Sequence, residues 1–142
     1  MGVGITGVTH WSIPVRDIDE AEQFYGEVLG LKHVGRLGNS VMTCFSVAEH
    51  KILLCEQPIQ ELKDDEIRVH HSFVVSSESL GGAAKMFKEK DIPMVGLVYR
   101  EKGFFTGREL YFYDPSGNKL ELRDPTWKPG MPTPTLDELI AS

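Results

Sequence analysis

The stretch His10-Trp-Ser-Ile-Pro-Val15 recurs sixty residues later as His70-His-Ser-Phe-Val-Val75, with a His, a Ser and a Val at matching positions. Both stretches show the alternation that is typical of a strand with one buried face. The correspondence continues with a shift that grows to 61 and then to 67 residues, in the pairs Gly35/Gly96, Phe45/Phe112 and Leu53/Leu120. The chain is therefore predicted to contain two copies of one structural module.

Each copy is predicted to fold as a strand, a helix and three further strands. In the first copy the helix is expected over 20–29, after the capping-box spacing of Asp17-Ile-Asp-Glu20 and before Gly30. In the second copy Ser79 begins a helix that runs to about Lys90. The later strands are expected at about 32–36, 41–47 and 50–56, and at about 94–99, 108–113 and 118–123. This pattern predicts an α+β fold of paired βαβββ modules within a single domain, 1–142.

The segments between and after the modules differ from them in composition. Module one covers about 5–56, module two covers about 70–123, and the polar, acidic segment 57–69 links them. The Pro-rich tail, 124–142, contains Thr135-Leu-Asp-Glu138, whose capping-box spacing predicts a short terminal helix. Trp127 and Met131 of this tail are expected to close over a cleft or to contact a neighbouring subunit.

The composition excludes several classes of protein. Hydrophobic residues make up 41% and charged residues 25% of the 142 residues, as in an ordinary globular domain. The 15 basic and 21 acidic residues give a formal net charge of -6 without a Lys/Arg cluster, so nucleic acid and membrane surfaces are not expected partners. The start of the chain lacks the pattern of a secretory signal, and a cytoplasmic protein is expected. Cys44 and Cys55 are expected to be free core thiols.

Strand alternation places three side chains that can bind a metal on faces opposite the helices. The apolar face of the first strand is predicted to consist of Trp11, Ile13 and Val15. His10 then points to the other side, as do His70 and Glu121 in their own strands. Two imidazoles and a carboxylate that converge on a cleft would bind one divalent metal ion and leave positions open for substrate or water. Imidazole suits Fe²⁺, Mn²⁺, Ni²⁺, Co²⁺ and Zn²⁺, and the carboxylate favours the harder of these ions.

Three segments resemble the vicinal oxygen chelate superfamily of glyoxalases, bleomycin-resistance proteins and extradiol dioxygenases. Gly7-Val-Thr-His10-Trp-Ser-Ile-Pro-Val-Arg-Asp17, followed by Ala21-Glu-Gln-Phe-Tyr25 and Val28-Leu-Gly-Leu31, resembles its opening. The segment that starts at His70 resembles the beginning of its second module. Tyr111-Phe-Tyr-Asp-Pro-Ser-Gly-Asn-Lys-Leu-Glu121 resembles its closing hairpin, where the Glu is a metal ligand. The resemblance covers roughly residues 5–124.

This resemblance implies an architecture and a ligand set. The paired modules would form a U-shaped, eight-stranded sheet around a metal ion held by His10, His70 and Glu121. Superfamily spacing and strand alternation both favour His70 over His71 as the ligand. His71 would then pack under the helix or donate a hydrogen bond to one of the metal ligands. A homodimer is also implied, often with sites shared between chains.

The repeat position of Glu121 indicates how many protein ligands to expect. Glyoxalase I-type members usually place a fourth ligand, Glu or Gln, at that position. A shift of 67 residues puts Leu54 there, which cannot bind a metal ion. Glu56, two residues further on the same face, would serve only if the strand register slipped. Three protein ligands are therefore expected, which leaves room for a bidentate substrate and a third molecule.

Tyr111 is the candidate catalytic residue, because it could donate a hydrogen bond to a metal-bound substrate oxygen; the alternative is an ordinary strand aromatic. The weaker candidates for the substrate pocket are Ser12, Phe104, Phe105, Tyr113 and Arg123. Arg123 is expected to pair with a substrate carboxylate or with Glu56. Phe104 and Phe105 are expected to form a wall for an aromatic substrate or a dimer contact.

A metal-dependent enzyme acting on a small molecule with vicinal oxygens is therefore expected. Extradiol-dioxygenase-like ring cleavage of a catechol-type compound, with Fe²⁺ or Mn²⁺, is the first hypothesis. A glyoxalase-like isomerase or lyase, with Zn²⁺, Ni²⁺ or Co²⁺ among its possible metals, and a non-catalytic drug- or metabolite-binding protein are the alternatives. Thiol transfer is disfavoured because the segment 104–109 is more apolar than the loop rich in Ser, Glu and Lys of the fosfomycin-type thiol transferases. The dioxygenase hypothesis lacks a clearly placed acid-base histidine among His33, His50 and His71.

Overall fold

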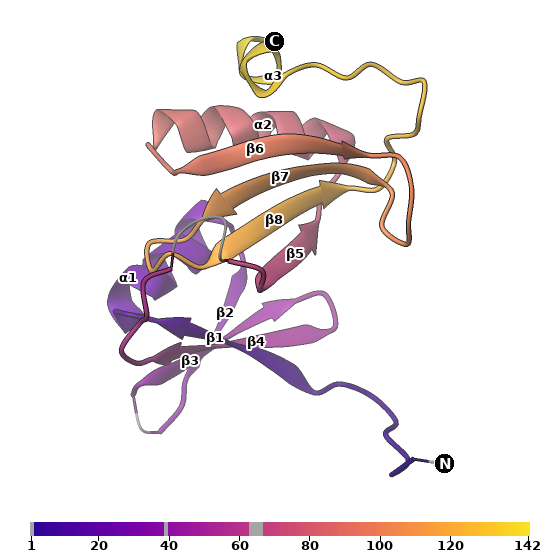
Figure 1. Ribbon diagram of the computed structural model, residues 1–142. Coiled ribbons are helices and arrows are strands. Elements are labelled where there is room, and N and C mark those ends of the chain that lie inside the picture. The colour runs from indigo at the N-terminus through magenta and orange to yellow at the C-terminus, as the bar shows by residue number, and fades with distance from the viewer. Residues whose placement is uncertain (1, 39, 63–66) are drawn as a thin grey trace. The chain divides into compact units, whose positions relative to one another are not determined.

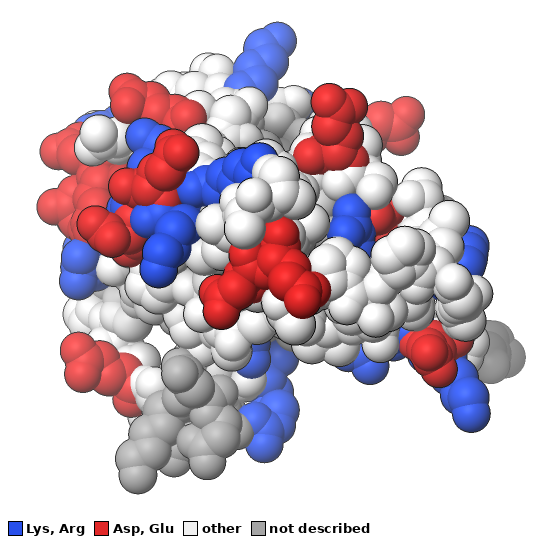
Figure 2. Space-filling model, turned by 90° about the horizontal axis from the view of Figure 1, so that it is seen from above, with Lys and Arg blue, Asp and Glu red and all other residues white. Residues whose placement is uncertain are grey.

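The computed structural model describes residues 2–38, 40–62 and 67–142, and the chain forms two compact units. Unit 1 is Met1–Glu61 and unit 2 is Leu62–Ser142. Each unit contains a four-stranded sheet (Figure 1). None of the described helices is long and apolar enough to span a membrane. Figure 2 shows basic side chains interspersed with acidic ones on the face seen from above.

Unit 1 consists of a strand, a helical segment and three further strands. Its elements are β1 (His10–Val15), α1 (Ile18–Gln23), the π-helical turn η1 (Phe24–Val28), β2 (Lys32–Arg36), β3 (Met42–Val47) and β4 (His50–Glu56). The strand order is β1-β4-β3-β2, with β1 parallel to β4 and the other pairs antiparallel. Its core includes the buried side chains of Ile13, Val15, Tyr25, Phe45 and Leu54.

Unit 2 repeats this order and adds a C-terminal helix. Its elements are β5 (His70–Val74), α2 (Ser77–Glu89), β6 (Met94–Arg100), β7 (Gly107–Tyr113), β8 (Lys119–Asp124) and α3 (Leu136–Ala141). The strand order is β5-β8-β7-β6, with β5 parallel to β8. The ring of Phe87 on α2 lies 4.5 Å from that of Phe112 on β7, so α2 covers one face of this sheet. The predicted α+β class and the paired βαβββ modules are confirmed.

The two units share a β-bulge at matching positions. The pairing of β2 with β3 shifts between His33 and Gly35, and the pairing of β6 with β7 shifts between Met94 and Gly96. Gly35 has a φ of 148, a backbone conformation that favours glycine. The predicted correspondence between Gly35 and Gly96 is therefore a real structural repeat.

The predicted correspondence between the last strands of the two modules is wrong by one residue. In unit 2, Ser72 of β5 lies opposite Glu121, and in unit 1 the matching Ser12 of β1 lies opposite Leu53. Leu53, not Leu54, is thus the counterpart of Glu121. The cause is the turn before that strand, which has one more residue in unit 2, where Tyr113 pairs with Lys119, than in unit 1. Leucine cannot bind a metal ion at either position, so the expectation of three protein ligands is unaffected.

The first helix begins earlier and ends differently than predicted. The side chain of Asp17 accepts a hydrogen bond from the backbone N–H of Glu20, which makes Asp17 the N-cap and starts α1 at Ile18. The segment predicted as one helix over 20–29 changes to a π-helical turn at Phe24. Gly30 follows with a φ of 73, a left-handed conformation that ends the helical segment.

The other two helices are also defined by their caps. α2 begins at Ser77 rather than at Ser79, because the hydroxyl of Ser76 accepts a hydrogen bond from the backbone N–H of Ser79. Thr135 and Glu138 form the predicted capping box at the start of α3.

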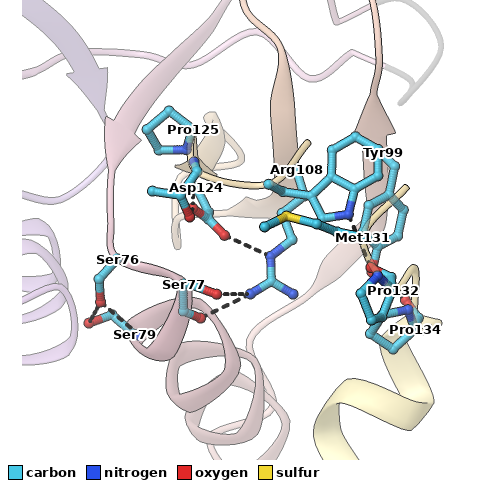
Figure 3. Close-up of polar contacts among 12 residues, drawn as sticks. Ser76, Ser77, Ser79, Tyr99, Arg108, Asp124, Pro125, Met131, Pro132 and Pro134 are labelled. Atoms are coloured by element: carbon cyan, nitrogen blue, oxygen red, sulfur yellow. Dashed lines mark hydrogen bonds and ion pairs between the residues drawn. The ribbon is translucent and has the colours of Figure 1, made fainter. Parts of the chain in front are cut away.

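A buried ion pair joins β7, β8 and the start of α2 (Figure 3). Nε of Arg108 donates to the carboxylate of Asp124 at 2.9 Å, and its Nη2 donates to the carbonyl and hydroxyl oxygens of Ser77 at 3.0 and 2.8 Å. Arg108 is 8% exposed and Asp124 is 1% exposed. These contacts fix the end of the sheet against the helix that covers it.

The C-terminal tail packs on unit 2 itself. Trp127 is 4% exposed, and its ring lies 5.0 Å from that of Tyr99. Nε1 of Trp127 donates to the carbonyl oxygen of Pro132 at 3.0 Å. The hydroxyl of Tyr99 donates to the carbonyl oxygen of Pro134 at 2.6 Å. Tyr99 pairs with Arg108 in the sheet, so these contacts lie on the side that faces α2. Trp127 is thus buried within its own unit. The sequence had instead led us to expect that it closes over a cleft or contacts a neighbouring subunit.

Gly107, at the start of β7, has no room for a side chain. Its φ is +137, and a Cβ atom would lie 2.5 Å from the carbonyl oxygen of Asp124. We expect Gly107→Ala to lower the free energy of unfolding by about 2–4 kcal/mol, from backbone strain and this contact together. Urea denaturation measures the loss. Gly117→Ala is the control, because its φ is +84 with nothing within 4 Å. Equal losses in the two variants would contradict the role of the contact.

Candidate metal and substrate site

His70, Glu121 and Tyr111 lie on one face of the unit 2 sheet. Glu121 of β8 pairs with Ser72 of β5 on one side and with Tyr111 of β7 on the other, and cross-strand partners point to the same face. His70 is two residues before Ser72 and shares this face. The rings of His70 and Tyr111 are 5.9 Å apart. Phe112, which contacts α2, points the other way, so this is the face opposite the helix.

The two candidate histidine ligands are held by neighbouring residues. Nδ1 of His70 lies 2.9 Å from the carbonyl oxygen of Arg68. Because a carbonyl oxygen only accepts, Nδ1 is the donor, and the lone pair of the neutral ring is on Nε2. Nδ1 of His10 likewise lies 2.9 Å from the hydroxyl of Thr9. A metal-bound histidine usually has its second nitrogen held in this way, so each of the two imidazoles is suited to bind a divalent metal ion.

The three candidate ligands are divided between the two units. His10 belongs to β1 of unit 1, whereas His70 and Glu121 belong to β5 and β8 of unit 2. Within residues 2–38, 40–62 and 67–142, no three His, Cys, Asp or Glu side chains gather as a metal site. His10 and Ser12 are exposed. Trp11 between them is 54% exposed, contrary to its prediction as a packed residue, whereas Ile13 and Val15 of the same strand face are buried.

His71 lies on the other face of the unit 2 sheet from Glu121. It pairs with Leu120 of β8, and its Nδ1 is buried without a hydrogen-bond partner among the described residues. Burial and the neighbouring His70 lower the pKa of His71, so the ring is neutral at neutral pH. Its position agrees with the preference for His70 as the candidate ligand.

Sequence reasoning missed Glu109, a buried carboxylate on the candidate face. Glu109 is 1% exposed. It accepts hydrogen bonds from Arg100 at 2.8 and 3.2 Å, from Nη1 of Arg123 at 3.0 Å and from the hydroxyl of Tyr111 at 2.8 Å. The available signal was the alternation in β7, which puts Glu109 on the same face as Tyr111.

These contacts determine the protonation states of the Glu109 carboxylate and the Tyr111 phenol. Burial by itself would raise the pKa of Glu109, but the hydrogen bonds from Arg100 and Tyr111 and the arginine charges outweigh it and lower the pKa. Burial and the neighbouring carboxylates of Glu121 and Glu109 raise the pKa of Tyr111. At neutral pH Glu109 is therefore ionised, while Tyr111 keeps its proton and can donate it in a hydrogen bond.

Within unit 2, Arg123 pairs with Glu109. Besides that ion pair, its Nη2 donates to the carbonyl oxygen of Thr106. Glu56 instead accepts a hydrogen bond from the backbone N–H of Ile18 at 2.8 Å, at the start of α1. The alternation of β4 puts Cys55, not Glu56, on the face of Leu53, so Cys55 is the repeat counterpart of Arg123.

Glu56 thus stabilises a helix terminus. We expect Glu56→Gln to leave the affinity for Mn²⁺ unchanged within about twofold and to lower the free energy of unfolding by about 1 kcal/mol or less, because the helix N-terminus loses a negative charge. Metal titration and urea denaturation of the same sample measure both effects. A large loss of metal affinity would revive the four-ligand arrangement.

Of the remaining pocket candidates in unit 2, Tyr113 lies on the candidate face and Phe105 lies beside it. Tyr113 is half-buried and shares the face of Tyr111. Phe104 is 100% exposed, and Phe105 is 68% exposed with its ring 5.6 Å from the guanidinium carbon of Arg123. The free thiols of Cys44 and Cys55 are half-buried on β3 and β4, not in the core as expected.

Comparison with known proteins identifies the family. Residues 7–122 match the Glyoxalase/Bleomycin resistance protein/Dioxygenase superfamily. The chain belongs to this superfamily, in agreement with the resemblance of its opening segment and closing hairpin.

Individual relatives extend over most of the chain. It is 27% identical over 130 residues to the metallothiol transferase FosB of Staphylococcus epidermidis, covering 89% of this chain and 87% of that protein. It is 30% identical over 129 residues to Glyoxylase I 4 of Arabidopsis thaliana, covering 83% and 70%. Among solved structures, the fosfomycin resistance protein FosX of Listeria monocytogenes, complexed with Mn(II) and sulfate ion, matches with a TM-score of 0.69 at 23% identity, covering 84% and 90%.

Proposed function

We propose that the protein is a divalent-metal-dependent enzyme that acts on a small molecule with neighbouring oxygen atoms. His10, His70 and Glu121 are its proposed metal ligands. The observation on which this proposal mainly rests is the common face of His70, Glu121 and Tyr111, together with the Nδ1 contact that leaves Nε2 of His70 available to a metal. A bound divalent ion would supply Lewis acidity at a substrate oxygen.

The chain's own residues have distinct roles in this proposal. Tyr111, neutral at neutral pH, donates a hydrogen bond to the substrate oxygen on which negative charge develops. Its hydroxyl donates to Glu109 in the structure, so it must turn from Glu109 to the substrate. Glu109 stays ionised and keeps Arg123 in place. Ser12, next but one to His10 on β1, is the proposed contribution of unit 1 to the pocket wall.

Two observations favour a glyoxalase-type isomerase or lyase over ring cleavage. The relatives named above are a thiol transferase, a glyoxylase and a fosfomycin resistance protein. Ring cleavage also calls for an acid-base histidine near the metal, and His71 is on the opposite face. His33 contacts Thr43 and Phe45 in unit 1, and His50 is exposed at the start of β4.

Oxygen consumption distinguishes the two reaction classes. With protein reconstituted anaerobically with Fe²⁺ or Mn²⁺, we expect no oxygen uptake above background with catechols in an oxygen electrode. Uptake that is abolished in His10→Ala would restore the dioxygenase hypothesis and reject the isomerase or lyase.

Metal content tests the ligand set. The candidate metals are Fe²⁺ and Mn²⁺, with Zn²⁺, Ni²⁺ and Co²⁺ as alternatives, and a related FosX structure contains Mn(II). Elemental analysis of protein purified without a His tag should find about one divalent ion per chain, and His10→Ala should lose it. Absence of metal after reconstitution would reject the enzyme in favour of a non-catalytic binding protein.

The proposal includes a homodimer located in the cytoplasm. The full exposure of Phe104 supports a contact between copies, although a wall for an aromatic substrate explains it equally well. Light scattering should give twice the 15.9 kDa mass of the chain. A monomer in solution would reject the dimer contact and leave a wall for an aromatic substrate as the role of Phe104.

A further inference from the structure

The candidate face of unit 2 has more positive than negative side chains. Its register puts three cations on it, Arg100, Lys119 and Arg123, and two carboxylates, Glu109 and Glu121. In the proposed function Glu121 is committed to a dication. Glu109 is then the one remaining carboxylate among the described residues of this face, and it pairs with the guanidinium groups of both Arg100 and Arg123.

Glu109 cannot balance both arginines. Its two oxygens already accept four hydrogen bonds, from Arg100, Arg123 and Tyr111. The Arg123 side chain is 11% exposed, so water solvates its charge poorly. Arg123 uses two of its N–H groups, on Glu109 and Thr106, which leaves three of the five without a partner among the described residues.

The ring of Phe105 forms a cation–π contact with this guanidinium group. The centroid of Phe105 is 5.6 Å from the guanidinium carbon of Arg123, and 68% of Phe105 is exposed. An exposed ring beside a poorly solvated cation provides an apolar surface and a charge at one place.

We propose that this part of the face binds the carboxylate of a substrate with an aromatic or other planar apolar body. Arg123 contacts the carboxylate, Glu109 and Arg100 position Arg123, and Phe105 packs against the body of the substrate. This inference rests on the proposed function, because it assigns the carboxylate to the substrate of that site.

The geometry favours a carboxylate over other anions. The planar fork of a guanidinium group matches the two oxygens of a carboxylate, and the charge excess over Glu109 is that of a single arginine. A monoanion neutralises the excess of these two arginines over Glu109, whereas a dianion would also have to engage Lys119, whose Nζ lies 5.3 Å from the centroid of the Tyr111 ring.

The test uses 4-fluorobenzoate as the probe, titrated into metal-free and metal-loaded protein and followed by fluorine NMR. 4-Fluorobenzamide is the neutral probe of the same shape, and phenylphosphonate is the dianionic one. The variants are Arg123→Lys, which keeps the charge but loses the fork, and Phe105→Ala, which leaves the ion pairs intact. Arg16→Lys, an exposed arginine of unit 1, is the matched control.

We expect saturable binding of 4-fluorobenzoate to the full-length protein and binding of the benzamide that is at least about tenfold weaker. Arg123→Lys should weaken benzoate binding about tenfold and Phe105→Ala about threefold or more, with no change in Arg16→Lys. Equal binding of benzoate and benzamide would overturn the inference, as would wild-type affinity in both variants. Tighter binding of phenylphosphonate would also overturn it.

The inference and the proposed function fail separately. Benzoate binding that depends on Arg123 in a protein that takes up no metal would support the anion site and reject the metal enzyme. A stoichiometric metal with no benzoate binding would do the reverse.

Discussion

Arg108→Met should lower the free energy of unfolding of unit 2 by about 3–5 kcal/mol, because it leaves the buried carboxylate of Asp124 without its cation. The variant also removes the hydrogen bonds that hold Ser77 at the start of α2. Urea denaturation followed by tryptophan fluorescence measures the loss. The two tryptophans lie in different units, so a Trp11→Phe background leaves Trp127 as the reporter of unit 2.

The matched control is Arg16→Met, which breaks the exposed ion pair between Arg16 and Glu20. Its side chains are 60% and 33% exposed, so we expect a loss below about 1 kcal/mol. Similar losses in the two variants would contradict the buried network as a source of stability.

The effect of Arg108→Met should also depend on pH. Burial opposes ionisation of Asp124, but hydrogen bonds from Thr126 and from Arg108 outweigh it and lower the pKa of Asp124. A lowered pKa contributes stability above the ordinary Asp value of about 4, and this stability is lost as the pH falls through the lowered value. The difference between wild type and Arg108→Met should therefore be largest at neutral pH and should shrink below about pH 4. A difference independent of pH would reject this ionic origin.

His70→Ala should weaken Mn²⁺ binding by more than about 100-fold, whereas His71→Ala should retain most of the affinity. The two residues are adjacent, but strand alternation places them on opposite faces of the sheet. His70 shares the face of Glu121, and its Nδ1 is held by the carbonyl of Arg68. Electron paramagnetic resonance of free Mn²⁺ during a titration gives both affinities.

His71→Ala also serves as the control for folding in this pair. It removes a half-buried side chain from the same strand, so a loss of metal binding that merely follows from a damaged sheet would appear in both variants. Far-ultraviolet circular dichroism checks that the sheet is intact. Loss of binding in His71→Ala with retention in His70→Ala would reject the assignment of the ligand face.

Much of the fold could be predicted from the sequence because its signals are local. Alternation identified the strands, capping residues such as Thr135 located a helix start, and the repeat paired Gly35 with Gly96, which are equivalent positions in the structure. The faces of His70 and Glu121 followed from the same alternation, since a side chain's face depends only on its own strand.

Registers and partners between strands could not be predicted in this way. One additional residue in a turn moved the counterpart of Glu121 from Leu54 to Leu53, because register depends on turn length. Glu109, the partner of Arg123 in unit 2, was missed for a related reason.

Local patterns in the amino-acid sequence were thus enough to predict the module repeat, the order of its elements and the common face of His70 and Glu121, all of which depend on residues near one another in the chain. The folded structure was needed to see that Arg100, Tyr111 and Arg123, which come from three different strands, share the single carboxylate of Glu109. A hydrogen bond depends on distances of a few tenths of an ångström between strands, and no pattern within one strand specifies those distances.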